Sequence, residues 1–150
     1  MMYTLLQLTW GLPQTLMGLV VFLLNLRRPH RMFSGAVLTS WKLKQSLSLG
    51  LFIFVSDDPF YFYQSQKNRY SYDEFFGMFA VHEYGHTIQS LMFGPLYLLI
   101  VGIPSLIWAD LPALINMRVR KRMSYFSIFP EKQANRLGEK YTGMKSPGMI

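Results

Sequence analysis

The sequence contains no cysteine and few charged residues. The lack of cysteine excludes disulfide bonds and thiolate ligands, so a metal site in this chain must use histidine and carboxylate side chains. Charged residues make up 15% of the chain, against about a quarter in an average soluble domain, while hydrophobic residues make up 51%. This composition favours a membrane protein. Because no linker-like segment or internal repeat divides the 150 residues, we expect one domain, residues 1–150.

The net charge of +7 arises largely from two clusters of basic residues. Arg27, Arg28 and Arg31 follow the apolar residues 1–26, and a second cluster at 118–122 follows another apolar run. Positive charge directly after an apolar run is typical of the cytoplasmic end of a membrane span. No nucleic-acid-binding motif accompanies the charge, so we expect no nucleic-acid partner.

Three apolar or partly apolar segments predict membrane-inserted helices: residues 1–26, 71–93 and 96–117. The first has its positive charge after the apolar run rather than before it, which favours an uncleaved span over a signal peptide. The second begins with a cap at Ser71 or Asp73 and stops at Gly94-Pro95. A final amphipathic helix is predicted from Pro130 to about residue 141.

Residues 35–55 combine period-two alternation with strand-forming side chains. We expect a β-hairpin in which residues 35–41 pair with 46–55 across a turn at 42–45. An interrupted or re-entrant helix is the alternative.

Two of the three histidines lie four residues apart in the second predicted helix. Positions i and i+4 share one helical face, so His82 and His86 can bind one metal ion together. Glu83 lies beside them, close enough to act as a general base on water at the metal. An accidental pair of histidines on a polar face is the alternative, but three ionisable groups in an apolar segment are costly without a function.

The segment His82-Glu83-Tyr84-Gly85-His86 resembles the zincin motif, and Gly85 is similar to the glycine of membrane zincins such as the site-2 proteases. The resemblance implies that the two histidines bind one zinc ion per chain and that Glu83 is the catalytic base. It also implies substrate held as an added strand on a sheet edge, which residues 35–55 could supply. The alternative role for this segment is to cover the helix that carries the histidines.

A third ligand is expected because a catalytic zinc usually takes three protein ligands. Glu131-Lys132-Gln133-Ala134-Asn135 resembles the Glu-x-x-Ala-Asp motif of the HtpX and CAAX-prenyl protease family, a gluzincin group. This implies Glu131 as third ligand, with Asn135 in place of the aspartate that supports a ligand histidine. Glu131 as a plain first-turn helix glutamate is the alternative.

Two further residues are candidates. Asp110 is an alternative third ligand, because site-2 proteases use an aspartate on a later span, although its Asp-Leu-Pro context departs from theirs. Tyr97 follows the Gly94-Pro95 turn, where it could support an oxyanion or anchor the chain at an interface. The remaining histidine, His30, is expected to be solvated.

The expected fold is therefore a mainly α membrane protein with about three membrane-inserted helices, a β-hairpin and a C-terminal amphipathic helix, around a minimal zincin-like core. The expected function is a zinc-dependent, membrane-embedded endopeptidase acting on membrane-proximal peptides or membrane proteins, with the lipid bilayer as a partner. The N-terminus is expected outside and the active site near the cytoplasmic face. A catalytically silent metal-binding membrane scaffold is the alternative, which Glu83 disfavours because structural zinc needs no base.

Overall fold

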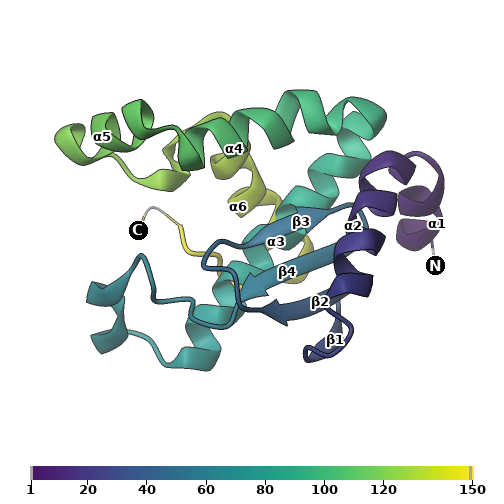
Figure 1. The fold of residues 1–150 in the computed structure, drawn as a ribbon, viewed down its shortest axis with the longest axis horizontal. Helices are drawn as coiled ribbons and strands as arrows, with labels where there is room; N and C mark the ends of the chain where they lie inside the picture. The colour runs from purple at the N-terminus through teal and green to yellow at the C-terminus, as the bar shows by residue number, and fades with distance from the viewer. Residues whose placement is uncertain (1, 149) are drawn as a thin grey trace.

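The computed structural model describes residues 2–148 and 150 and consists of a four-stranded sheet with helices packed around it (Figure 1). Its helices and strands are α1 (Met2–Thr9), α2 (Leu12–Leu24), β1 (His30–Phe33), β2 (Ala36–Trp41), β3 (Leu47–Leu49), β4 (Phe52–Ser56), α3 (Tyr72–Phe93), α4 (Ile103–Asp110), α5 (Pro112–Lys121) and α6 (Phe129–Thr142). Short helical turns are η1 (Gln64–Asn68), η2 (Gly94–Leu96), η3 (Leu98–Gly102) and η4 (Tyr125–Ser127).

The sheet has the strand order β1-β2-β4-β3 and is mixed. β2 and β4 are parallel, with Val37 opposite Phe52, whereas β1–β2 and β3–β4 are antiparallel. The predicted hairpin between residues 35–41 and 46–55 is therefore wrong. Gly50 has a φ of +59° and forms a tight turn between β3 and β4, a conformation that glycine adopts without steric cost. This turn divides the predicted second strand in two, and β4 then aligns parallel to β2.

The predicted mainly α membrane fold is also wrong, because the chain forms an α/β structure. Residues 1–26 do not form one span: α1 and α2 meet near Gly11 at an angle of 96°. The chain also turns by 119° between α3–η2 and η3–α4, at Tyr97, three residues after Gly94, whose φ is +52°. Among the described residues, no single helix has both the length and the apolar character needed to cross a bilayer. Each of these two bent pairs has that length and composition only when its two helices are taken together.

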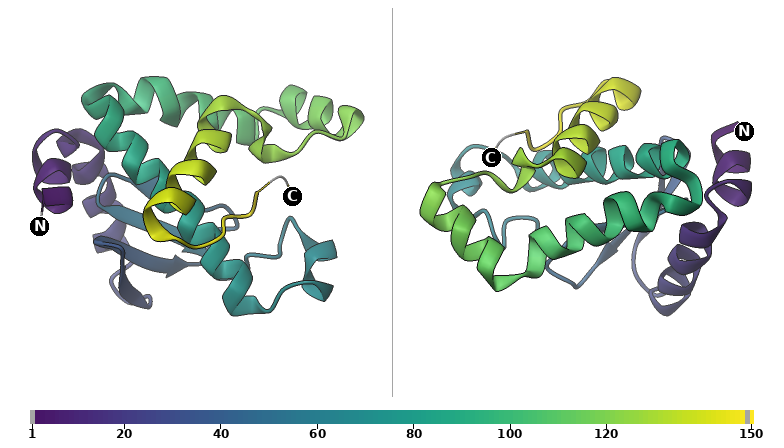
Figure 2. Two further views of the ribbon diagram at one scale, coloured as in Figure 1. Left: turned by 180° about the vertical axis from the view of Figure 1, so that it is seen from behind. Right: turned by 90° about the horizontal axis from the view of Figure 1, so that it is seen from above.

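The central helix α3 has the predicted start and end. Ser71 accepts a hydrogen bond from the Glu74 backbone N–H, while the Glu74 side chain accepts one from the Ser71 backbone N–H, so the two form a capping box. One side of α3 packs on the sheet through the core cluster of Ala36, Leu38, Ile53, Val55, Phe76, Ala80, Tyr84 and Ile88. Another side packs against α6, the predicted C-terminal amphipathic helix, which lies across α3 (Figure 2). The helix α3 is thus enclosed on two sides.

Candidate metal centre

The centre lies where α3 meets α6. His82 and His86 are four residues apart on α3, with 3% and 6% of their surfaces exposed, and Glu131 in the first turn of α6 is fully buried. The Glu131 Oε2 atom is 3.1 Å from Nε2 of His82 and 3.5 Å from Nε2 of His86. The three residues place one ligand atom each within 4.8 Å of one another, so this group can hold a metal ion.

Glycine residues allow the two helices to approach closely. A Cβ atom on Gly85 of α3 would overlap the backbone carbonyl of Ala134, and one on Gly138 of α6 would overlap the carbonyl of Val81. Both substitutions would place a side chain against a backbone group, which cannot move without shifting its helix. The glycine of the His-Glu-Tyr-Gly-His segment therefore has a structural reason, since it brings Glu131 to the histidines.

Each histidine is oriented by a neutral amide. The Nδ1 atom of His82 is 2.8 Å from Oδ1 of Asn135, and the Nδ1 atom of His86 is 2.6 Å from Oε1 of Gln89. The amide nitrogens donate elsewhere, that of Asn135 to the Gly148 carbonyl and that of Gln89 to the Pro130 carbonyl. Both amide oxygens must therefore accept from an imidazole Nδ1–H, which leaves the two Nε2 lone pairs directed at Glu131.

The two Nε2 atoms and Glu131 need a proton or a metal ion between them. The Oε1 atom of Glu131 accepts a hydrogen bond from Ser105, but its buried Oε2 has no hydrogen-bond partner. Two imidazole lone pairs facing a carboxylate oxygen repel it unless a proton or a metal ion lies among them. Burial alone would lower the pKa of His86, but Glu131 outweighs it and raises this pKa to about 9. Burial alone would raise the pKa of Glu131, but the histidines hold it well below its usual range.

The donor set fits zinc. Two imidazole nitrogens and one carboxylate are a known ligand combination for catalytic zinc, which keeps a further coordination position open. Imidazoles whose Nδ1–H groups are tied to amide oxygens present Nε2 in a fixed direction, as metal-binding histidines require. The Oε2 atom of Glu131, which has no hydrogen-bond partner, is available as a third donor.

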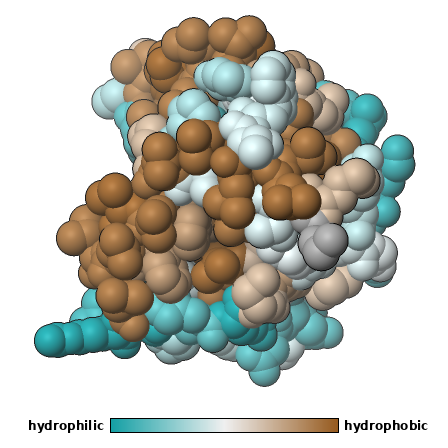
Figure 3. Space-filling model, turned by 90° about the vertical axis from the view of Figure 1, so that its right-hand side faces the viewer, coloured by the Kyte–Doolittle hydropathy of each residue, from teal (hydrophilic) through white to brown (hydrophobic). Residues whose placement is uncertain are grey.

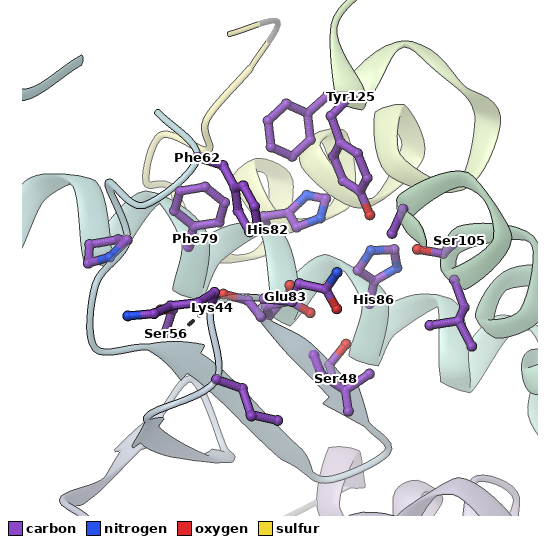
Figure 4. Close-up of a pocket in the computed structure, with 18 of the residues that line it drawn as sticks. Lys44, Ser48, Ser56, Phe62, Phe79, His82, Glu83, His86, Ser105 and Tyr125 are labelled. Atoms are coloured by element: carbon purple, nitrogen blue, oxygen red, sulfur yellow. Dashed lines mark hydrogen bonds between the residues drawn. The ribbon is translucent and has the colours of Figure 1, made fainter. Parts of the chain in front are cut away.

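Glu83 lies beside the three ligands without joining them. It follows His82 on α3, is 5% exposed, and lines the same cavity as the histidines (Figure 4). Burial raises the pKa of the Glu83 carboxyl, while the two histidines oppose that effect. A carboxylate with a raised pKa is a stronger base than one in water, so Glu83 is suited to accept a proton beside the metal.

A cavity of about 650 Å³ opens in front of the centre. One wall is the edge strand β3, with Ser48 near Glu83, and the opposite side carries Ser105 and Tyr125 (Figure 4). The Tyr125 hydroxyl is directed toward the space between the two imidazoles and Ser105. Burial raises the pKa of Tyr125 well above its usual range, so the hydroxyl stays protonated and can donate a hydrogen bond.

The other predicted site residues divide into two groups. Asn135 meets His82 as expected, and Tyr97 is buried in the wall of the cavity, where burial raises its pKa. Asp110 is not brought to the centre. It lies exposed at the end of α4, where it accepts a hydrogen bond from Gln45 at 2.5 Å. His30 begins β1 at the surface.

Three contributors were not predicted. Gln89 is three residues after His86, so its i+3 spacing on one helix was a usable signal. Ser105 and Tyr125 reach the centre only because η3–α4 and η4 fold over it, and no local sequence pattern indicates that. Comparisons with protein-family models, curated proteins and solved structures find no match to this chain. The interpretation of the centre therefore depends on its geometry.

Proposed function

We propose that this chain is a zinc-dependent peptidase. The observation that carries the proposal is the meeting of His82, His86 and Glu131 at one buried point, with Glu83 beside them and an open cavity in front. A structural metal site needs ligands only, and it gains nothing from a buried carboxylate that does not coordinate. A hydrolytic site needs that carboxylate as its base. The resemblance of the motif to zincins supports the same reaction.

The residues take distinct roles in the proposed reaction. His82, His86 and Glu131 hold the zinc ion, which supplies a Lewis acid and lowers the pKa of water. Glu83 accepts the proton of the attacking water and delivers it to the leaving amine. Asn135 and Gln89 fix the imidazole orientations. The protonated hydroxyls of Tyr97 and Tyr125 are donors available to the developing oxyanion.

The cavity favours an extended substrate. β3 is an edge strand of the sheet and lines the cavity, so its unpaired backbone groups can pair with a peptide laid beside it. Peptide bonds in such a strand lie next to Glu83. The proposed substrates are peptides or protein segments close to a membrane.

The proposed partner for the outer surface is a lipid bilayer. On α1, α2 and the turn that joins them, the large apolar side chains that are more than half exposed are Met2, Leu5, Trp10, Leu16, Val20, Leu23 and Leu24. Figure 3 shows the apolar face that carries these helices. A contiguous exposed apolar surface of this kind is typical of an interaction site. Residues 1–26 contain no charged side chain. They are followed by the exposed cation Arg27, whose charge complements that of anionic headgroups.

Contact with a bilayer through this face requires no helix to cross it. The orientation predicted from the sequence, with the N-terminus outside and the centre near the cytoplasmic face, remains a prediction.

The decisive experiment separates catalysis from metal binding. Zinc-loaded protein is incubated with fluorescein-labelled casein and with an internally quenched peptide library. We expect the wild type to cleave and Glu83→Gln to lower the rate by about 100-fold to 10,000-fold while keeping the zinc. Asp73→Asn, which neutralises an exposed carboxylate on the same helix, serves as the matched control. Zinc binding by a wild type that cleaves nothing would favour the metal-binding scaffold, and cleavage that survives Glu83→Gln would contradict the role of Glu83.

A further inference from the structure

A cation lines the cavity that contains the metal ligands. Arg118 lies in the last turn of α5, and its side chain forms part of the same cavity wall as His82, Glu83 and His86. Of the other basic residues at this helix end, Arg120 and Lys121 lie outside that cavity, and Arg122 lines it with an exposed side chain. Arg118 is therefore the half-buried member of this basic cluster that lines the cavity.

The Arg118 guanidinium is held in place by two aromatic rings. Its Cζ atom is 5.0 Å from the ring centroid of Trp108 and 5.2 Å from that of Tyr125. The Arg118 guanidinium thus lies over the ring of Tyr125, and the hydroxyl of Tyr125 is directed toward the imidazoles (Figure 4). Stacked guanidinium groups keep their hydrogen-bonding edge free for a partner. One tyrosine side chain consequently fixes the separation between this cation and the metal centre.

The hydrogen-bonding edge of Arg118 is not satisfied. Nη2 makes one long hydrogen bond to the Ala109 carbonyl at 3.5 Å, and the buried Nη1 has no hydrogen-bond partner. Among residues 2–148 and 150, no carboxylate forms an ion pair with it, whereas Arg28 pairs with Asp57 at 2.5 Å. A buried cationic nitrogen without a partner is costly, so this edge is built for a group that arrives from outside the chain.

Tyr63 provides a second indication that Arg118 and the centre share one small space. It lines the same cavity, where burial raises its pKa to about 12. Arg118 opposes that rise and Glu131 adds to it, so the Tyr63 hydroxyl lies within electrostatic reach of both groups.

We propose that Arg118 binds a carboxylate of the substrate, so that the preferred substrates are peptides with an anionic group a fixed distance from the bond that is cleaved. A planar guanidinium binds a carboxylate through two parallel hydrogen bonds, which sets both position and orientation. A peptide C-terminus and an aspartate or glutamate side chain present the same group. This proposal rests on the proposed peptidase function and names its substrate class.

The test measures binding separately from cleavage. Zinc-loaded Glu83→Gln protein is titrated with labelled peptides of one sequence that end in a free carboxylate or an amide, and that carry glutamate or glutamine internally. We expect an anionic peptide to bind about 10-fold to 100-fold more tightly than its neutral counterpart. The pair that shows the difference identifies the source of the carboxylate, either the C-terminus or the side chain.

Three substitutions in this background assign the effect. Arg118→Gln should abolish the preference for the anionic peptide without weakening binding of the neutral one. Arg118→Lys keeps the charge but loses the paired hydrogen bonds, so it should retain only part of the preference. Arg120→Gln makes the same change of charge at an exposed position on the same helix and should retain all of it.

Zinc content and thermal unfolding show whether each variant is folded. If Arg118→Gln does not fold, Arg118→Lys decides the outcome. Equal binding of anionic and neutral peptides, or a preference that survives Arg118→Gln, would overturn the proposal. If only Arg118→Lys folds, a preference for the anionic peptide as strong as that of the parent protein would overturn the proposal. A wild type that shows the preference but cleaves no peptide would instead contradict the peptidase function and leave the carboxylate site in place.

Discussion

The backbone carbonyl of Ala134 occupies the space in which a Cβ atom on Gly85 would lie. The same relationship recurs four residues along each helix, where the Val81 carbonyl fills the space beside Gly138. Positions 131, 134, 135 and 138 form one stripe along α6. The stripe that contacts α3 therefore carries both the third ligand, Glu131, and the amide that orients His82. The close packing of α6 on α3 therefore also brings the third ligand and the orienting amide to the histidines.

We expect Gly85→Ala to damage the centre even though it changes no ligand. The added methyl group forces α6 away from α3, and overpacking of this kind costs about 1–3 kcal/mol. Glu131 then moves away from the two Nε2 atoms, so zinc affinity should fall by at least about 10-fold. Thermal unfolding and titration with a chromophoric zinc chelator measure the two effects.

Gly77→Ala is the matched control on the same helix. A Cβ atom on Gly77 meets no atom within 4 Å. Because alanine is favoured over glycine in a helix, this variant should gain about 0.5–1 kcal/mol and keep its zinc. Equal zinc affinity in the Gly85 and Gly77 variants would contradict the packing argument.

The ligand assignment predicts the metal content of a series of variants. Purified wild-type protein should contain about one zinc ion per chain, and His82→Ala, His86→Ala and Glu131→Gln should each lose it. Asp110→Asn should keep the metal, since Asp110 is exposed and bonded to Gln45 rather than to the centre. His30→Ala provides the histidine control. Elemental analysis after gel filtration is the measurement, and zinc that depends on Asp110 but not on Glu131 would refute this ligand set.

The apolar surface of α1 and α2 predicts binding to lipid vesicles. We expect the wild type to float with phosphatidylcholine vesicles and to bind more strongly when phosphatidylglycerol is added, because of the basic residues beside the surface. A charged side chain is strongly disfavoured in the apolar part of a bilayer. The double variant Val20→Asp with Leu24→Asp should therefore reduce the bound fraction by about 10-fold or more. Both residues are more than half exposed, so the fold should be unaffected.

The control for that experiment carries the same two added charges elsewhere. Tyr141→Asp with Met144→Asp changes two exposed side chains at the C-terminal end of α6 and after it, and should float like the wild type. If the wild type stays in the aqueous fraction with both kinds of vesicle, the bilayer is not its partner.

Signals confined to one element were sufficient to predict α3 and α6. Three predicted signals act within a few residues of the helix end that they define: the cap at Ser71, the stop at Gly94 and the entry at Pro130. The spacing of His82 and His86 is equally local. Glu131 lies 45 residues further along the chain, and its place beside the histidines was implied only by the motif around it.

Predictions failed where the outcome depends on distant segments. Hydropathy identifies residues 1–26 as apolar but does not indicate the bend near Gly11 between α1 and α2. It also cannot show that Gln7 and Gln14 donate hydrogen bonds to Thr87 and Ser90 on α3. Alternation predicted strands in residues 35–55 but not their partners, because period two fixes the faces of a strand and not its neighbours.

The two amides that orient the histidines predict a graded loss of zinc. Gln89→Ala removes the acceptor for His86 Nδ1–H, and Asn135→Ala removes the acceptor for His82. Each leaves a buried donor unpaired and lets one imidazole rotate, so zinc affinity should fall by about 10–100-fold in either variant, far less than after loss of a ligand.

The two amides act on different rings, so the losses of zinc affinity should multiply in the double variant of Gln89→Ala with Asn135→Ala. Gln133→Ala is the control, since Gln133 accepts a hydrogen bond from Gln89 at 2.9 Å but touches neither imidazole. Its effect should be smaller than that of Gln89→Ala. Competition against a chelator of known affinity gives all four values, and a Gln89→Ala variant with wild-type affinity would show that His86 keeps its orientation without the amide.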